Sequence, residues 1–210
     1  MVSLDPAMGT GGDFAAIQVF ELPTFEQVGE WHHNQTPMNQ QIRILQGINK
    51  HLHDSIMEQD ASATPQIFYS MENNTIGEAA LLRVMDIGEE NIQGMFLSEP
   101  IRKGHRRKFR RGFNTTAKHK IDACTKFKEL IENGKMKINS QLLISELKDF
   151  VASGLSFKAK PGQHDDLVSS CLLMTRMMKV LADFDPKIFE KWTDRTSELT
   201  PMPIFGTFNG

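Results

Sequence analysis

Short apolar runs predict strands, most of them in the first hundred residues, because such runs of roughly four to eight residues bounded by turn residues are typical of strands. The runs AAIQVFE and QVGEWHH flank LPTF, which indicates a hairpin. The other runs are shorter and end at polar breaks. The predicted strands are residues 1–5, 15–21, 26–33, 66–71, 92–97 and 135–138.

Apolar residues recurring at intervals of three and four predict helices between and after these strands. The segment 38–60 has one such face, made of Ile42, Leu45, Ile48, Leu52 and Ile56. In the segment 114–134 the expected buried stripe is Ala117, Ile121, Cys124, Phe127 and Ile131. The predicted helices are residues 38–60, 73–85, 114–134, 140–150 and 163–182, with a turn or hairpin over 152–162.

The order of these elements predicts an α/β protein. Its mixed sheet begins with an antiparallel hairpin and continues as βαβ units, with helices packed on both faces. The length of 210 residues suits one sizeable core. We therefore expect one domain over 1–190 and an extended tail over 191–210, where proline and glycine replace any periodicity.

Composition narrows the class of protein only slightly. The formal net charge of −2 says nothing about partners. Cys124 and Cys171 both lie in apolar stretches, which indicates buried, reduced thiols. The N-terminus lacks a secretory signal, and no apolar run approaches the roughly 20 residues needed to cross a bilayer. We expect a soluble, intracellular protein without membrane partners.

Acidic residues stand at three predicted element ends. Asp5 ends the first strand, Glu72 follows the strand 66–71, and Asp165 and Asp166 open the last long helix in the stretch GQHDDLV. Each has an ordinary structural alternative. Asp5 precedes a proline-glycine turn, Glu72 precedes a polar loop, and acids in the first turn of a helix favour its dipole. The dipole explains one aspartate better than two.

Convergence of these acids at one edge of the sheet would create strong repulsion in a cleft of low dielectric. Divalent cations relieve such repulsion, and carboxylate oxygens suit Mg²⁺ or Mn²⁺. Two ions about 4 Å apart clamp a phosphodiester, one activating water and one stabilising the leaving oxygen. The pattern therefore favours a metal site for phosphodiester hydrolysis.

Three motifs resemble the nuclease domain of the large terminase subunit of tailed, T4-like bacteriophages. The stretches DPAMGTGGDFAAIQV, YSMENNTIG and GQHDDLV resemble its three motifs in order, and NTTAKHKIDACTKFKELIENGKMKI resembles the segment before the third. The resemblance covers roughly residues 1–185. It implies an RNase H-like fold that cuts concatemeric double-stranded viral DNA during genome packaging, in the cytoplasm of the host.

The resemblance also implies roles for individual acids. By motif position, Asp5, Glu72 and Asp166 are the catalytic, metal-binding acids, probable carriers of two Mg²⁺ or Mn²⁺ ions in the family. Asp13 matches a further acid of the first motif, and Asp165 is the other acid of the third. Successive helix residues point about 100° apart, so we expect Asp166 rather than Asp165 to be the main ligand. His164 either orients a ligand or lies at the surface.

The family's large subunits also carry an ATPase domain with a phosphate loop, and no GxxxxGK[ST] sequence occurs here. The resemblance therefore implies a nuclease half that cuts DNA without translocating it. The partners it implies are double-stranded DNA, the terminase ATPase domain, the portal and the small terminase subunit.

The run RKGHRRKFRR concentrates positive charge without a single acid. One interpretation is a solvated loop, and the other is a DNA backbone contact that positions the duplex without reading sequence. Lys118, Lys120 and Lys126 are expected to extend this surface from the outward face of the helix 114–134. The predicted contacts are Arg102, Lys103, Arg106, Arg107, Lys108, Arg110 and Arg111.

The sequence therefore predicts a metal-dependent DNA endonuclease. Two alternatives stay open at this point. The first is another RNase H-like nuclease, such as a junction resolvase or a transposase-type enzyme, with the same acids and a different substrate. The second is a binding module that holds nucleic acid through its basic run while its acids serve structure.

Overall fold

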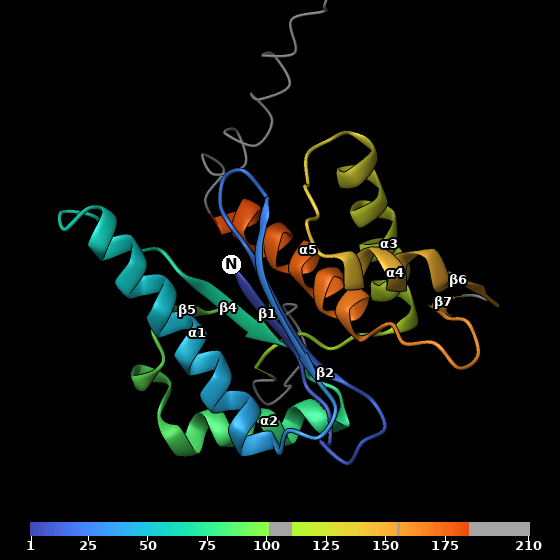
Figure 1. Cartoon of the computed structure of the whole chain (residues 1–210), viewed down its shortest axis with the longest axis horizontal. Helices are drawn as coiled ribbons and strands as arrows, with labels where there is room; N and C mark the ends of the chain where they lie inside the picture. The colour runs from blue at the N-terminus through green and yellow to red at the C-terminus, as the bar shows by residue number, and fades with distance from the viewer. Residues whose placement is uncertain (101–110, 155, 185–210) are drawn as a thin grey trace, which may run out of the picture.

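A mixed five-stranded sheet forms the centre of the computed structural model, which describes residues 1–100, 111–154 and 156–184 (Figure 1). Its order is β3-β2-β1-β4-β5. The strand β1 pairs antiparallel with β2 and parallel with β4. The strands are β1 Val2–Asp5, β2 Ala15–Phe20, β3 Gln27–His33, β4 Phe68–Met71 and β5 Met95–Phe96.

Helices cover both faces of this sheet, as the pattern predicted (Figure 1). On one face, Leu4 and Ile17 pack with side chains of α1 (Met38–Gln59) and α2 (Thr75–Ile87). On the other face, Ala16 and Phe20 pack with α3 (Ala117–Glu132), α4 (Gln141–Asp149) and α5 (Asp166–Phe184). Successive strand residues alternate between faces, so each strand serves both cores.

The second predicted hairpin is also confirmed. The strands β6 (Phe150–Ser153) and β7 (Ser156–Ala159) pair antiparallel as a separate two-stranded sheet. The predicted strand 135–138 is wrong in extent, because the structure has only an isolated bridge between Glu26 and Lys137 there. The short 3₁₀ turn η1 (Glu89–Asn91) precedes β5 and shortens the predicted strand 92–97 to its last part.

The buried stripe of α3 differs from the predicted one. Cys124 and Phe127 are buried as expected, but Ile121 and Ile131 are each 36% exposed. Ala123 and Leu130 take their place. Residues three and four apart share a helix face, so periodicity alone leaves the rotation of the stripe open, and packing against α5 decides it.

Several expectations about the chain as a whole are resolved differently. Cys124 and Cys171 are buried free thiols, as predicted. None of the helices in the described ranges is both long and apolar enough to cross a membrane. The predicted tail 191–210 and the domain boundary at 190 lie outside the described residues.

Candidate metal centre

Parallel pairing brings Asp5 and Glu72 together at one edge of the sheet. Asp5 ends β1, and Glu72 follows the last residue of β4. The Glu72 amide donates to the Leu4 carbonyl at 3.1 Å, which continues the β1–β4 ladder up to the two acids. Their carboxyl groups share a side-chain hydrogen bond. Two carboxyl groups in such contact hold a proton between them or a cation.

Burial and neighbouring charge act on Asp5 in the same direction. Burial first, then the charge of Glu72 and their shared hydrogen bond, and then the charges of Asp166 and Asp165, raise the pKa of Asp5 well above its usual range. Four of the predicted acids therefore occupy one electrostatic site. In the absence of a cation, this site disfavours its own fully ionised form.

The start of α5 brings Asp166 to the same site. Its pKa rises to about 6, chiefly because of burial, while a hydrogen bond from the Phe14 amide and the nearby His164 oppose the rise. His164 Nδ1 lies 3.5 Å from Asp166 Oδ2 although its own side chain is 48% exposed. The charge of Asp13, an exposed residue, adds to the rise in the pKa of Asp166. Asp13 therefore lies near the acids, as the first motif implied.

Asp165 and Asp166 have different partners. Asp165 Oδ2 lies 3.3 Å from Lys120 Nζ, and both side chains are part-buried. Lys120 also lies over the Phe150 ring, 5.4 Å from its centre. The prediction that Lys120 faces outward toward DNA is therefore wrong, because this side chain points from α3 to the start of α5. The ion pair occupies the Asp165 carboxylate and leaves Asp166 turned to the other acids.

The first turn of α2 holds Glu72 in place. Asn74 donates to Glu72 Oε2 at 2.8 Å and caps the helix by accepting the Ile76 and Gly77 amides. A Cβ at Gly77 would stand 1.8 Å from the Glu72 carbonyl oxygen, which no packing allows. The glycine of the second motif therefore lets α2 approach the Glu72 peptide directly.

Two residues that the sequence analysis missed, His32 and Glu146, complete the group. His32 lies in β3 and Glu146 in α4, and their Nε2 and Oε1 atoms are 3.8 Å apart. Burial raises the pKa of Glu146 to about 7, against hydrogen bonds from the Val168 and Leu167 amides at the start of α5. Neither residue stands at an element end that parallel pairing would align, so the pattern of the chain held no signal for them.

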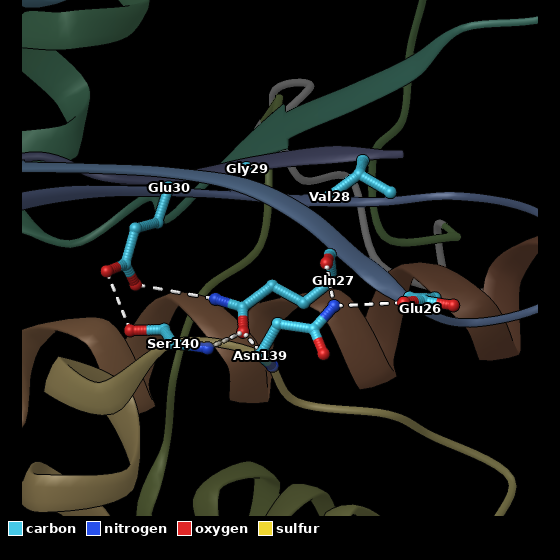
Figure 2. Close-up of a pocket in the computed structure, with 7 residues that line it drawn as sticks. All are labelled: Glu26, Gln27, Val28, Gly29, Glu30, Asn139 and Ser140. Atoms are coloured by element: carbon cyan, nitrogen blue, oxygen red, sulfur yellow. Dashed lines mark hydrogen bonds between the residues drawn. The ribbon is translucent and has the colours of Figure 1, made fainter.

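A polar network places α4, and therefore Glu146, on the sheet (Figure 2). Gln27 Oε1 accepts the backbone amides of Asn139 and Ser140, each at 2.9 Å, and Ser140 Oγ donates to Glu30 Oε1 at 2.6 Å. Ser140 also caps α4 by accepting the Leu143 amide. These residues line a shallow pocket that contains none of the predicted acids. Its role is structural: it ties the N-terminus of α4 to β3.

Among the residues of the basic run, only Arg111 falls within the described ranges. It pairs with Glu89 and lies over the Phe96 ring, 5.9 Å from its centre. This member of the run is therefore held against η1 and β5. The other predicted DNA contacts, Arg102, Lys103, Arg106, Arg107, Lys108 and Arg110, lie outside the described residues.

Residues 2–177 match the family model of the terminase RNaseH-like domain. The chain belongs to this family. The recognition made from the three motifs is therefore confirmed, and so is the fold class. The site acids of this terminase domain lie at the strand ends and helix start where those motifs placed them.

Solved terminase nucleases have a similar fold. The large terminase nuclease from thermophilic phage G20c with bound cobalt has a TM-score of 0.55 at 15% identity, over 83% of this chain and 79% of that one. The same nuclease with bound magnesium gives 0.54 at 16%, over 84% and 80%. The human cytomegalovirus terminase nuclease domain, manganese-soaked and inhibitor-bound, gives 0.54 at 16%, over 84% and 80%. At these identities the likeness shows the fold.

Proposed function

We propose that this terminase domain is a Mg²⁺- or Mn²⁺-dependent endonuclease that cuts double-stranded viral DNA during genome packaging. The observation that carries the proposal is the hydrogen-bonded pair of Asp5 and Glu72, with Asp166 close enough to raise the pKa of Asp5. Family membership supplies the context of packaging. A structural role alone does not account for acids that oppose one another's ionisation at one edge of the sheet.

The donor set fits a hard divalent cation. Asp5, Glu72 and Asp166 would hold it through carboxylate oxygens, which Mg²⁺ and Mn²⁺ prefer. Asp13 and Asp165 would contribute from the rim, Asp165 once Lys120 releases it. When bound, two such ions supply positive charge to the attacking and leaving oxygens of an in-line phosphodiester hydrolysis. The expected products end in a 3′-hydroxyl and a 5′-phosphate.

The protein's own groups prepare the site in three ways. Asp5 and Glu72 hold a proton that they give up when a cation binds, because metal ligands must be deprotonated. The backbone amide of Phe14 orients the Asp166 carboxylate. Asn74 orients Glu72 through its Oε2 atom. Each acid is therefore fixed by a neighbour that does not itself titrate.

DNA is the proposed substrate, with the basic run as its backbone contact. The proposed packaging partners are the terminase ATPase domain, the portal and the small terminase subunit, in the host cytoplasm. Membership of the terminase family supports these partners as a class.

A plasmid-cleavage assay tests the proposed function. Supercoiled plasmid is incubated with the protein and Mg²⁺, Mn²⁺ or EDTA, and linear duplex, four-way junction and RNA–DNA hybrid substrates follow. We expect metal-dependent cutting of duplex DNA that Asp5→Asn, Glu72→Gln and Asp166→Asn abolish. Asp122→Asn, on the exposed face of α3, is the matched control and should cut normally. Equal cutting by all four variants would disprove the assigned site, and preference for junction or hybrid would change the substrate.

A further inference from the structure

One row of the sheet points toward α5 from three adjacent strands. Asp5 in β1 is in register with Ala16 in β2, and Ala16 is in register with His32 in β3. Residues in register on neighbouring strands project from the same face, and strands lie about 4.8 Å apart. Ala16 is buried in the core that contains α5. The Asp5 and His32 side chains therefore flank a small residue beneath the start of α5.

Three metal-binding side chains meet on the His32 side of this row. One ligand atom each from His32, Glu146 and Asp166 lies within 4.8 Å of the others. They come from β3, α4 and the first residue of α5. Asp166 therefore takes part in two groups, one with Asp5 and one with His32. The second group differs in kind, because it includes an imidazole nitrogen.

The atoms that face this second position have no other partner that would engage them. His32 Nε2 is a buried atom without a hydrogen-bond partner among the described residues. The 3.8 Å separation from Glu146 Oε1 is too long for a hydrogen bond. Glu146 uses Oε2 to accept the Val168 amide at 3.1 Å. The Oε1 atom and the histidine nitrogen are thus both turned to the same space.

The rings around His32 keep its nitrogen directed there. The Phe14 ring stacks on the His32 ring at 4.1 Å between centres and 12° between planes. Phe14 also donates its amide to Asp166. One residue therefore orients both the imidazole and one of the carboxylates, which is the kind of support that metal ligands require.

We propose that His32, Glu146 and Asp166 form a cation position of mixed nitrogen and oxygen ligands, beside the Asp5–Glu72 pair, that takes a first-row transition ion in preference to Mg²⁺. Imidazole suits transition ions, whereas Mg²⁺ favours oxygen ligands and keeps its waters. The inference rests on the proposed function only in that Asp166 is common to both groups.

Pulsed electron paramagnetic resonance on the full chain loaded with Mn²⁺ tests the proposal directly, since a coordinated imidazole nitrogen modulates the Mn²⁺ signal. We expect ¹⁴N modulation in the parent and its loss in His32→Ala. His33→Ala is the control, because His33 is exposed and engages Thr36 instead. His164→Ala tests the other imidazole near Asp166 and should keep the modulation. Circular dichroism checks that each variant is folded.

Calorimetric titration provides a second readout. His32→Ala and Glu146→Gln should each weaken Co²⁺ binding by about tenfold or more, since loss of even an outer partner of a ligand has an effect of this size. Mg²⁺ binding should change little in His32→Ala. Glu146→Gln keeps an oxygen to accept the Val168 amide, so α5 should retain its start.

The outcomes separate this proposal from the proposed function. Mn²⁺ that binds without ¹⁴N modulation, in a protein that cuts DNA, overturns the His32 position alone. Modulation that survives His32→Ala and disappears in His164→Ala overturns it in favour of His164. A protein that shows ¹⁴N modulation dependent on His32 but cuts no DNA supports the position and contradicts the nuclease function.

Discussion

The carboxyl groups of Asp5 and Glu72 share a hydrogen bond where two parallel strands end. The pair lies against the start of α5, whose aspartates add to the unfavourable charge. The metal-free site therefore opposes the stability of the fold in its ionised form. Such conflicts between local chemistry and stability are characteristic of functional sites.

The raised pKa values predict how the stability of the metal-free protein depends on pH. Burial raises the pKa of Asp166 from 3.8 to about 6, so the folded state binds more protons than the unfolded state between these values. The stabilisation is complete below pH 4 and is lost as pH rises through about 6, a loss of roughly 3 kcal/mol for this group. Urea unfolding in EDTA at a series of pH values measures it.

The control for this pH dependence is Asp166→Asn, which lacks the titrating group. The difference between the parent and Asp166→Asn in free energy of unfolding should change in the stated direction as pH rises. A difference that favours the parent more at pH 8 than at pH 4 would show that the carboxylate is stabilised in its charged form.

Neutralising one member of the acid pair should stabilise the metal-free protein at pH 8. Asp5→Asn removes a buried charge that Glu72, Asp166 and Asp165 oppose, so we expect a gain on the order of 1 kcal/mol or more. Thermal unfolding in EDTA measures the gain, and saturating Mg²⁺ should reverse the order because the parent alone binds it fully. The surface change Asp122→Asn should shift neither curve, and a lower melting temperature for metal-free Asp5→Asn would contradict the repulsion.

The two aspartates of the third motif should differ in their effect on cleavage. Asp166→Asn removes a proposed ligand and should reduce cutting to background, whereas Asp165→Asn should reduce it by roughly 10- to 100-fold, as expected for a supporting residue. Single-turnover cleavage in Mn²⁺ compares them. Lys120→Met tests the ion pair: if Lys120 acts through Asp165, adding it to Asp165→Asn should change the rate little. The reverse order of the two aspartates would assign the main ligand to Asp165.

Gly77→Ala should impair the site through the backbone. The added Cβ would collide with the Glu72 carbonyl oxygen at 1.8 Å, so α2 or the Glu72 peptide must move. We expect loss of cleavage together with a lower melting temperature. Gly47→Ala is the matched control in α1, where the new Cβ meets nothing within 4 Å. It should stabilise the protein by about 0.5–1 kcal/mol and leave cleavage unchanged.

Gln27→Ala should lower stability without touching the acids. Its side-chain oxygen accepts two backbone amides, and its Nε2 donates to Gln18 at 2.7 Å, all in a part-buried setting. Loss of these bonds leaves donors unsatisfied, which typically destabilises by about 1–3 kcal/mol. Urea unfolding measures the effect. Val28→Ala, on the exposed side of the same strand, should stay within about 0.5 kcal/mol, and a similar effect of both variants would refute the network.

Most of the fold could be predicted from sequence, because alternation and helical periodicity are local properties of the chain. The hairpin of β2 and β3, the helices on both faces and the positions of Asp5 and Glu72 at parallel strand ends follow from such patterns. The boundaries of α3 were accessible as well. Its rotation was not, because neighbouring stripes on one helix are equally periodic until a partner helix selects one.

The sequence by itself determined that Asp5, Glu72 and the aspartates of GQHDDLV stand at element ends, and the order of the motifs identified the family. Only the tertiary structure decided that Lys120 takes Asp165, and that His32 and Glu146 face Asp166. His32 and Glu146 are 114 residues apart in number and lie on elements whose contact depends on how α4 packs over β3. Local patterns specify an element and its faces, whereas such a meeting depends on packing between elements distant in the chain.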